Sequence, residues 1–248
     1  MDSRREQILS LLEQHQALSV RTLADELHTS ESTVRREAAL LEQQGVVQRL
    51  YGSIMLNRYA GSVVPLSVRD GEASARKESI ARAAAQMVED NMTVMMDASS
   101  TVRRMAKYLS VRKGLTVITN NLRIMEEGLL PNAVIYCTGG LYFEKNRAFT
   151  GPAAEQSISK VHADMLFFSS QFLSLQGEIS DHGEAETSLR RVMLERADTR
   201  VCLMDSGKLG KHGRFTLCTR EDVDRILCDA PLPWEGENTC KPTDKVVL

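Results

Sequence analysis

The residues from Thr29 to Gly45 combine two adjacent arginines with several hydroxyl side chains, in the sequence TSESTVRREAALLEQQG. Read at helical spacing, the apolar residues share one face: Val34, Ala38 and Leu41. The polar residues collect on the N-terminal half of the opposite side: Ser32, Thr33, Arg35 and Arg36. Arginine can fork onto guanine, and serine and threonine can bond to base edges or phosphates, so these residue types suit a helix end placed in a DNA major groove.

Local signals set the limits of this helix. Ser30 is a good N-cap, Glu31 suits the first turn, and Gly45 is a plausible stop. A surface helix whose arginines are merely solvated is the competing interpretation, because charged faces are common on helices. The neighbouring elements favour DNA binding.

Two more short helices are predicted ahead of this one. The sequence from Ser3 to Glu6 is a capping-box pattern, followed by residues at helical spacing: Ile8, Leu11, Leu12 and His15. A short apolar link from Ala17 to Val20 leads to a second helix, which Ser19 can cap. That helix would carry Leu23, Ala24 and Leu27. A polar turn at His28-Thr29 then gives the order helix, helix, turn, helix.

After the third helix, the sequence VVQRLYGSIML predicts two strands joined by a short turn that contains Gly52. Three helices and a β-hairpin make a winged helix-turn-helix domain over residues 1–57, with the helix-turn-helix at about 20–44. In the hairpin, Arg49 and Tyr51 are placed to reach phosphate or the minor groove. The predicted DNA-binding residues are Ser30, Ser32, Thr33, Arg35, Arg36, Arg49, Tyr51 and Gly52.

The charge of this domain limits how it can bind DNA. Residues 1–57 carry six Arg, no Lys, and eight Asp or Glu, so the domain is not basic overall. Affinity from phosphate contacts then requires local clustering, which Arg35, Arg36 and Arg49 would supply. We expect a protein with so few positive charges to depend on dimerisation to bind tightly.

Residues 58–75 contain glycine and proline among polar residues and are predicted to be a linker. From residue 76 to 248, short apolar runs alternate with helical stretches, which predicts an α/β domain with a mostly parallel sheet. The predicted strands lie at 93–96, 115–119, 133–137, 165–169, 200–204 and 225–228, and the predicted helices at 76–88, 101–109, 122–129 and 184–197.

Polar and small residues follow four of these predicted strands. In open α/β sheets, ligands bind outside the carboxyl ends of the strands, and the first backbone N–H groups of a helix suit a phosphate or carboxylate. Lys208 can add a counter-charge, and Asp97 and Asp205 suit sugar hydroxyls. The predicted effector-binding residues are Asp97, Ser99, Ser100, Thr101, Thr119, Asn120, Asn121, Gly139, Gly140, Asp205 and Lys208. For any single loop, turn formation and helix capping are the simpler explanation. Four such loops at one edge of one sheet favour an anionic ligand.

Composition excludes several other classes. The formal net charge of −2 argues against general polyanion binding, and no run of 18 apolar residues predicts a membrane span. The N-terminus lacks the apolar core of a signal peptide, and the five cysteines contain no CxxC pair, so we expect reduced thiols in a cytoplasmic protein. Scattered histidines predict no metal site, and the P-loop order is absent, so no cofactor is expected.

These motifs together resemble the deoxyribose-operon-repressor (DeoR) family of bacterial transcription regulators. The resemblance covers most of the chain. It includes RREQILSLLEQHQALSVRTLADEL, S-x-x-T-V-R-R-E and L-L-E-Q-x-G in the first part. In the second part it includes Lys77, D-A-S-S-T, T-N-N, T-G-G, F-x-G, A-D and D-S-G-K-L-G. In the hairpin turn, Tyr51-Gly52-Ser53 departs from the family's usual H-G-G.

The resemblance implies a DNA-binding domain joined to a sensor domain that looks like ribose-5-phosphate isomerase and glucosamine-phosphate deaminase. Such sensors bind phosphorylated sugars or related metabolites without turning them over. Lys77 and Glu186 join the effector-binding residues on this ground. Family members usually repress operons for carbohydrate metabolism and act as homodimers or tetramers, so double-stranded operator DNA, a phosphorylated sugar and a second copy of the chain are the expected partners.

Two other functions stay open at this point. A sugar-phosphate isomerase or deaminase needs a carboxylate base, and a deaminase adds a ring-opening histidine. The residues that make this conceivable are Asp97, Asp181, His182, Glu184 and Glu186. Against this function, the N-terminal domain has no role in such an enzyme. In the third alternative, the second domain serves only for oligomerisation.

Overall fold

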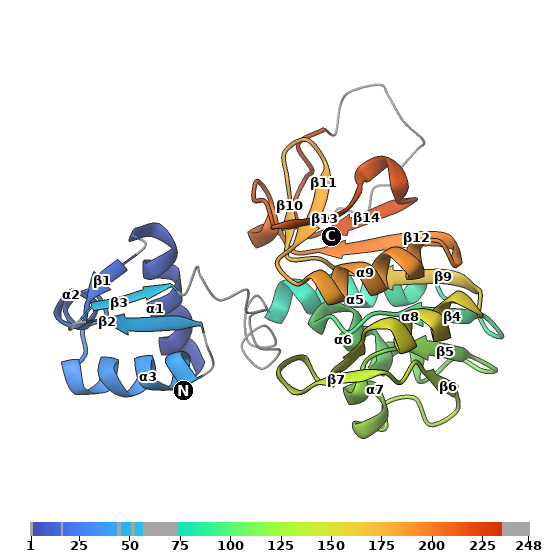
Figure 1. The fold of residues 1–248 in the computed structure, drawn as a ribbon, viewed down its shortest axis with the longest axis horizontal. Coiled ribbons are helices and arrows are strands. Elements are labelled where there is room, and N and C mark those ends of the chain that lie inside the picture. The colour runs from blue at the N-terminus through green and yellow to red at the C-terminus, as the bar shows by residue number, and fades with distance from the viewer. Residues whose placement is uncertain (1, 16, 44–45, 51–52, 57–73, 235–248) are drawn as a thin grey trace. The chain divides into compact units, whose positions relative to one another are not determined.

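The computed structural model describes residues 2–15, 17–43, 46–50, 53–56 and 74–234. The chain divides into two compact units, residues 1–72 and 73–248 (Figure 1). Nearly all of the predicted linker, from residue 58 to residue 73, lies outside the described part. The two units are therefore taken separately.

The N-terminal unit contains three helices and a small antiparallel sheet. Its elements are α1 (Asp2–His15), β1 (Ala17–Ser19), α2 (Val20–Glu26), α3 (Glu31–Gln43), β2 (Val47–Leu50) and β3 (Ser53–Leu56). The strand order is β1-β3-β2. Its core is built from side chains of every helix and of the hairpin: Ile8, Leu12, Leu23, Val34, Ala38, Leu41, Val47 and Ile54. The predicted helix-turn-helix with a hairpin is confirmed.

Three details of the first helices differ from the prediction. Helix α1 begins at Asp2, so Ser3 lies inside its first turn and is not its cap. Leu9 is buried on its inner face, whereas His15 is exposed at the helix end. The link from Ala17 to Ser19 forms strand β1, which pairs with β3 antiparallel, so the hairpin is part of a three-stranded sheet.

The C-terminal unit alternates strands and helices. In chain order its first half has α5 (Ser74–Gln86), β4 (Thr93–Met96), α6 (Ser100–Leu109), β5 (Thr116–Thr119), α7 (Leu122–Glu126), β6 (Val134–Cys137), β7 (Leu141–Phe143), η1 (Glu144–Asn146) and β8 (Ala148–Thr150). Its second half has α8 (Pro152–Ser159), β9 (Ala163–Phe168), β10 (Phe172–Leu173), β11 (Glu178–Asp181), α9 (Glu184–Leu194), β12 (Ala197–Met204), η2 (Ser206–Lys208), β13 (Phe215–Thr219), η3 (Arg220–Asp222) and β14 (Arg225–Cys228).

A six-stranded sheet forms the centre of this unit, in the order β14-β12-β9-β4-β5-β6. All five strand pairs are parallel, which confirms the predicted sheet. One apolar cluster packs α5 and α6 against one face through residues such as Ile80 and Val102. A second cluster packs α8 and α9 against the other face through Ile158 and Leu189. The sheet is thus covered on both faces, as its apolar strands require.

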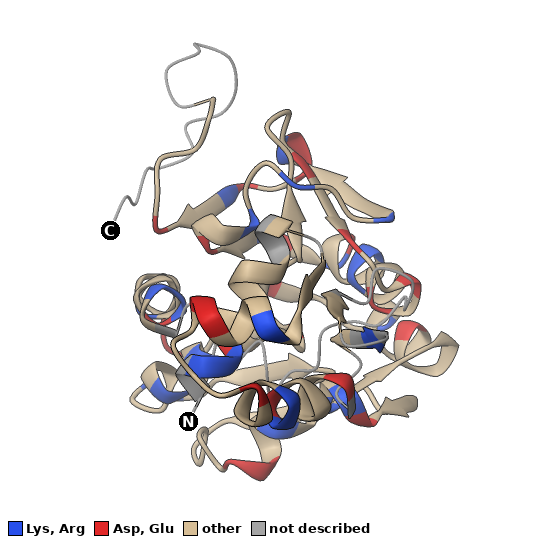
Figure 2. Ribbon diagram, turned by 90° about the vertical axis from the view of Figure 1, so that its left-hand side faces the viewer, with Lys and Arg blue, Asp and Glu red and all other residues tan. Residues whose placement is uncertain are grey.

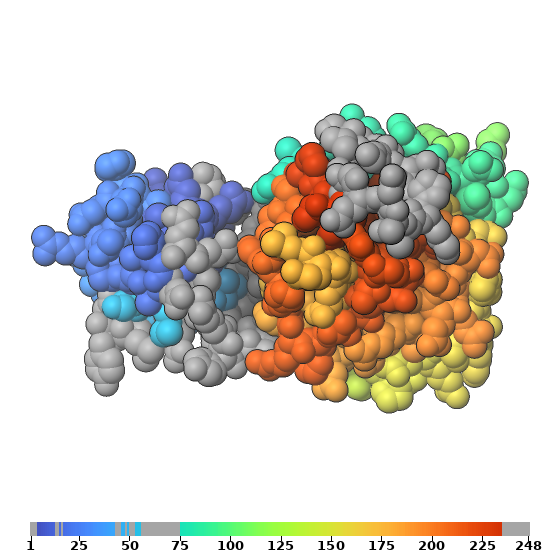
Figure 3. Space-filling model, turned by 90° about the horizontal axis from the view of Figure 1, so that it is seen from above, coloured from blue at the N-terminus to red at the C-terminus, as the bar shows by residue number. Residues whose placement is uncertain are grey.

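Several elements of this unit were not predicted. Helix α8, the β7–β8 hairpin and a three-stranded antiparallel sheet, β10-β11-β13, are absent from the prediction. Helix α7 ends at Glu126, earlier than the predicted residue 129, and α5 begins at Ser74, two residues before the predicted start. Figure 3 shows the yellow-orange segment near residue 175 beside the orange-red segments of residues 215–234 on one surface.

The exposed apolar side chains of the described residues are unevenly distributed. The large ones are Leu40, Val111, Val134, Tyr136, Leu141, Tyr142, Phe143 and Leu175. Five of these eight lie in β6 and β7, between residues 134 and 143. Strand β6 is also an edge strand of the large sheet. Among the described helices, none has the length and apolar character needed to cross a membrane.

Candidate functional site

The first turn of α3 presents a cluster of hydroxyl groups. Ser30 caps the helix, because its Oγ accepts a hydrogen bond from the backbone N–H of Thr33 at 3.2 Å. The Ser30 hydroxyl also lies 2.8 Å from the Ser32 hydroxyl and 2.9 Å from the Thr33 hydroxyl. These three side chains are therefore held together at the helix start, where the dipole of the helix favours an anion.

Arg35 and Arg36 lie on the exposed side of α3, opposite the buried Val34, Ala38 and Leu41. Their side chains are 57% and 70% exposed. Each approaches a glutamate of the same helix, Arg35 to Glu31 at 3.0 Å and Arg36 to Glu37 at 3.5 Å. The Arg35–Glu31 pair is exposed on both sides and contributes only about 0–1 kcal/mol, so a DNA phosphate or base edge can replace Glu31 at low cost. Glu37 is 13% exposed and also pairs with Arg5, so it keeps a partner when Arg36 turns to DNA.

Arg49 of β2 is held by Glu42 more closely than Arg35 and Arg36 are held by their glutamates. Its Nε lies 2.6 Å from Glu42 Oε2, and its backbone N–H donates to Glu42 Oε1 at 3.0 Å. The backbone hydrogen bond first and the side-chain bond second lower the pKa of Glu42. Arginines and acidic residues are interspersed along the sequence of the N-terminal unit, and Figure 2 shows both kinds mixed over the ribbon of the whole chain. Two further predicted DNA-binding residues, Tyr51 and Gly52, lie outside the described residues.

The predicted effector-binding residues lie where parallel strands end. Asp97 and the helix start Ser99–Thr101 follow β4, Thr119 ends β5, and Asn120 and Asn121 follow it. Gly139 and Gly140 follow β6, and Asp205 and Lys208 follow β12. Because β12, β9, β4, β5 and β6 are adjacent and parallel, these ends share one edge of the sheet. This edge is called the sensor rim below.

Ser169, which follows β9, joins two parts of the sensor rim. Its backbone N–H donates to Asp97 Oδ2 at 3.3 Å, and its hydroxyl accepts from Lys208 Nζ at 2.9 Å. Lys208 also lies 3.7 Å from Asp205. Asn120 instead bonds to the backbone oxygen of Phe149 at 2.9 Å. The structure therefore brings the Asp97 and Lys208 loops together through a residue that was not predicted to take part.

Some polar atoms at the sensor rim are buried without a hydrogen-bond partner among the described residues. They are Thr101 Oγ1, Asn120 Oδ1, Asn121 Nδ2 and Thr150 Oγ1. Leaving such a group unsatisfied costs about 1–3 kcal/mol, so each one requires an explanation. Three of the four belong to residues predicted to bind an effector, and Thr150 adds a fourth that the sequence did not indicate.

The glycines at the end of β6 have a backbone reason to be glycine. Gly139 and Gly140 have φ of +63° and +112°, which L residues with a side chain rarely adopt. A Cβ on Gly140 would also lie 2.7 Å from the backbone oxygen of Thr150. The close approach of these two segments therefore depends on Gly140.

Two residues that the family resemblance added come from helices. Lys77 lies on α5 and is only 3% exposed. Glu186 lies in the first turn of α9, is 9% exposed, and accepts a hydrogen bond from Asn146 Nδ2 at 2.7 Å. Asn146 belongs to the β7–β8 hairpin, so Glu186 connects α9 to that hairpin.

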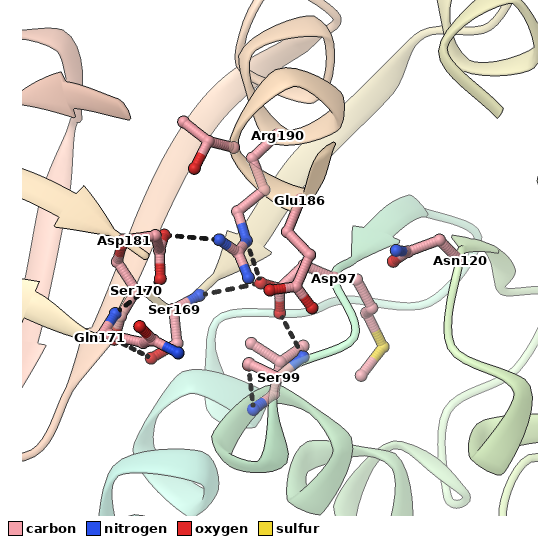
Figure 4. A network of polar contacts seen from close by, with 12 residues as sticks. Asp97, Ser99, Asn120, Ser169, Ser170, Gln171, Asp181, Glu186 and Arg190 are labelled. Carbon is pink, nitrogen blue, oxygen red and sulfur yellow. Dashed lines mark hydrogen bonds and ion pairs between the residues drawn. The ribbon is translucent and has the colours of Figure 1, made fainter. Parts of the chain in front are cut away.

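Arg190 of α9 lies at the centre of the site but was not among the residues that the sequence predicted to form it. Its Nε donates to Asp97 Oδ2 at 2.8 Å and its Nη1 donates to Asp181 Oδ2 at 2.6 Å (Figure 4). Burial opposes its charge, but Asp181, Asp97 and Glu186 outweigh that effect and raise the pKa of Arg190. Its place among the buried residues of α9, between Leu189 and Met193, was a signal that an arginine there needs buried partners.

Of the residues that suggested an enzyme, two are buried and paired with Arg190, and two are exposed. Asp97 and Asp181 both pair with Arg190, and each is 1% exposed. His182 is exposed beside Phe172, with ring centroids 4.7 Å apart. Burial first, and the charge of Arg214 second, lower the pKa of His182. Glu184 is exposed at the start of α9.

The described cysteines are free thiols, and Cys240 lies outside the described residues. Burial raises the pKa of Cys202, Cys218 and Cys228, that of Cys218 to about 12. Such thiols are poor nucleophiles. Within the described residues, no group of three or more His, Cys, Asp or Glu side chains is arranged to hold a metal ion.

The chain resembles known proteins along both units. Residues 4–59 match the family described as "DeoR-like helix-turn-helix domain", and residues 72–230 match "DeoR C terminal sensor domain". A solved structure of D-ribose-5-phosphate isomerase in complex with phospho-erythronic acid is 15% identical, with a TM-score of 0.41 over 55% of this chain and 54% of that chain.

Curated relatives extend over nearly the whole chain. The "HTH-type transcriptional regulator GolR" of Listeria innocua is 30% identical over 91% of this chain and 89% of its own length. The "Putative aga operon transcriptional repressor" of Escherichia coli O157:H7 is 30% identical over 99% and 93%. The "Transcriptional repressor AccR" of Agrobacterium fabrum is 31% identical over 92% and 89%. With a helix-turn-helix unit followed by a sensor unit, this chain belongs to the DeoR family of transcriptional regulators.

Proposed function

We propose that this protein is a sequence-specific DNA-binding repressor of a carbohydrate-metabolism operon, controlled by a phosphorylated sugar or a related anionic metabolite. The observation that carries the proposal is the exposed arginine face of α3 in a chain whose two units both match DeoR domains. The printed names of relatives include an aga operon repressor and an L-fucose operon activator. Those names support carbohydrate metabolism as the regulated process.

We assign the DNA contacts to the two elements that expose arginines. Ser32, Thr33, Arg35 and Arg36 would enter the major groove, while Ser30 holds the start of the helix. Arg49, with Tyr51 and Gly52, would contact the backbone beside it. These assignments are supported by the exposure of Arg35 and Arg36 and by the position of Arg49 on the hairpin.

The DNA assignment is tested with a duplex selected from a random library by the full-length protein. Arg35→Ala and Arg36→Ala should each weaken binding of that duplex by about 1–3 kcal/mol if the arginines reach base edges. Arg4→Ala, which removes an exposed arginine of α1, is the matched control and should change affinity little. Gel-shift titrations that give wild-type affinity for both α3 variants would contradict the assignment.

For the effector we propose the sensor rim. Three observations support an anionic ligand there. Helix α6 begins at the rim, and Lys208 is partly exposed beside Ser169. Thr101, Asn120 and Asn121 have buried polar atoms without partners among the described residues. The remaining proposed contacts are Lys77, Ser99, Ser100, Thr119, Gly139, Gly140, Glu186 and Asp205, while the buried Asp97 is assigned to holding the loops that carry them.

The effector assignment is tested by thermal shift with pentose, hexose and hexosamine phosphates. A ligand that binds the native state raises stability, by about 2.7 kcal/mol at a hundred times its Kd. Lys208→Met should lose most of that stabilisation, whereas Lys211→Met, an exposed lysine nearby in sequence, should keep it. A screen in which no sugar phosphate stabilises the wild type would contradict the sensor assignment and favour a second unit that serves only for oligomerisation.

We also propose that the protein does not turn over its ligand, because Asp97 and Asp181 are held by Arg190 and are not positioned as free bases. Incubation of the purified protein with the same phosphates, followed by product analysis, tests this. Isomerised or deaminated product would favour the enzyme alternative.

The domain division that we propose is residues 1–57 for DNA binding, 58–75 for the linker and 76–248 for the sensor. We propose that the protein acts in the cytoplasm as a homo-oligomer. The exposed apolar residues of β6 and β7 support self-association, because large exposed apolar groups mark interaction sites. Sedimentation equilibrium of the wild type and of Phe143→Lys tests it, since a lysine there should weaken the assembly. A monomeric wild type would contradict the proposal.

A further inference from the structure

A single guanidinium connects several loops at the sensor rim. Arg190 is 5% exposed, and its two hydrogen bonds go to aspartates from different segments, Asp97 after β4 and Asp181 at the end of β11. A buried cation is tolerated only when it is paired and hydrogen-bonded. Figure 4 shows Arg190 descending from α9 between the two carboxylates. The position of the guanidinium is therefore fixed by both loops at once.

Each aspartate in turn accepts hydrogen bonds from backbone N–H groups of the sensor rim and so holds the backbone there. Asp97 Oδ1 accepts from the N–H of Ser99 at 2.9 Å, and its Oδ2 accepts from the N–H of Ser169 at 3.3 Å. Asp181 Oδ1 accepts from the N–H of Gln171 at 2.9 Å, and its Oδ2 accepts from the Ser170 hydroxyl. Asp97 thus connects the start of α6 to the loop after β9, and Arg190 joins both to Asp181 at the end of β11.

Neither aspartate is placed to contact a ligand. Both are 1% exposed, and both oxygens of each carboxylate already accept hydrogen bonds. Asp97 was predicted to bind the effector directly, but its geometry is that of a support for neighbouring backbone. The groups next to it that can meet a ligand are those of the loops it holds, such as the Ser169 hydroxyl beside Lys208.

We propose that Arg190 is the positioning residue of the effector site: it joins the loops after β4, β9 and β11 into one unit and so sets the geometry in which the rim receives its ligand. This inference rests on the proposed function of the rim. Glu186, one helical turn earlier on α9, bonds to Asn146 of the β7–β8 hairpin. A displacement of α9 would therefore alter the rim and that hairpin together.

The first test replaces Arg190 by lysine in the full-length protein. Lysine keeps the charge but lacks the planar fork that reaches two acceptors at once. Arg191→Lys is the matched control, because Arg191 is the next residue of the same helix and donates to the backbone oxygen of Thr216 instead. In Arg190→Lys, the amide hydrogens of Ser99, Ser169 and Gln171 should exchange at least tenfold faster, as followed by NMR. Rates equal to those of the control would overturn the proposal.

The second test uses Asp181→Asn, which removes one partner of Arg190 and preserves the shape of the side chain. Asp181 has no hydrogen bond to Ser99, and its two routes to Ser99 run through Arg190 and through residues 169–171, which also bond to Asp97. Faster exchange at Ser99 therefore supports coupling through Arg190 only if Ser170→Ala, which loosens that loop and keeps both Arg190 pairs, leaves Ser99 unchanged; equal acceleration in Ser170→Ala would overturn the proposal. A rise confined to Gln171 would show that the two loops are independent and would overturn the proposal. This variant decides the question even if Arg190→Lys does not fold.

A ligand measurement separates positioning from general stability. The probes are inorganic phosphate, a pentose phosphate and a hexosamine phosphate, with stabilisation of the protein as the signal. A positioning role raises the concentration for half-maximal stabilisation at least tenfold in Arg190→Lys, whereas a purely structural role lowers the melting temperature without changing that concentration. If none of the probes stabilises the wild type, the proposed sensor function fails, and the exchange rates still decide the role of Arg190.

Discussion

Replacing Glu42 by glutamine should weaken the fold slightly and strengthen DNA binding. Glu42 neutralises Arg49, whose Nε lies 2.6 Å away, and both side chains are partly exposed at 34% and 44%. A pair of this exposure contributes roughly 0.2–1 kcal/mol to stability. Glutamine can still accept from the backbone N–H of Arg49, so the free energy of unfolding should fall by no more than that amount.

The effect on DNA binding has the opposite sign. Without the carboxylate, the guanidinium of Arg49 is available to one phosphate, and each phosphate contact changes the salt dependence of log K by about 0.9 per decade of salt. Over a fourfold change in salt this corresponds to a factor of about 3.5 in affinity. We therefore expect Glu42→Gln to bind a selected duplex about three- to tenfold more tightly near 50 mM salt, with a salt slope steeper by about 0.9.

The assay is fluorescence anisotropy at several salt concentrations, with urea unfolding of the same proteins. Glu6→Gln, at an exposed glutamate of α1, makes the same change in net charge and serves as the control. An unchanged slope in Glu42→Gln would show that Arg49 does not contact DNA. Weaker binding would show that Glu42 is needed to orient the hairpin, and either result would refute the reasoning.

Three further results are expected. Ser30→Ala should lower the free energy of unfolding of the N-terminal unit by about 1 kcal/mol, because it removes the cap of α3. Ser32→Ala should leave that free energy unchanged, and thermal melts of the two variants test the difference. Gly139→Ala should lower the free energy of unfolding by about 1–2 kcal/mol, because alanine disfavours the positive φ of this position. Gly140→Ala should lower it further, because the new Cβ would also lie 2.7 Å from the backbone oxygen of Thr150. Urea unfolding measures both changes. Burial raises the pKa of Cys218 from 9.0 to about 12. The raised value favours the neutral thiol in the folded state, so its contribution to stability is present below pH 9 and falls by about 1.4 kcal/mol per pH unit above it. Because burial also raises the pKa of Cys202 and Cys228, both proteins lose stability in this range, but urea unfolding between pH 8 and 10 should show a smaller loss in Cys218→Ala than in the wild type.

The sequence predicted the elements whose apolar pattern is regular. The period of Val34, Ala38 and Leu41 identified α3, and all three residues are fully buried. The apolar runs of the parallel strands were equally clear, because strands covered on both faces are continuous in apolar residues. The polar residues after those strands were placed correctly at one edge of the sheet, since parallel strands end on the same side.

The missed elements lack such patterns. Strand β1 has three residues, and its pairing with β3 depends on a segment far along the chain. The β11–β13 pairing contains an irregular register between Ile179 and Ser180, which disturbs the alternation of side chains. Arg190 contacts Asp97 across 93 residues of sequence, so no local signal could name the partner. Its place between the apolar Leu189 and Met193 could have indicated that Arg190 is buried and needs a partner, but only the fold shows which one.

The small sheet of the N-terminal unit limits how the protein can adapt to operators with different spacings of their half-sites. Strand β3 is its central strand, bonded to β2 on one side and to β1 on the other, and β1 joins α1 to α2. The hairpin is therefore fastened to the helices and cannot hinge away from α3 without breaking a row of backbone hydrogen bonds. The domain would therefore bind DNA as one rigid body, and any adjustment to a different spacing of half-sites must come from outside it.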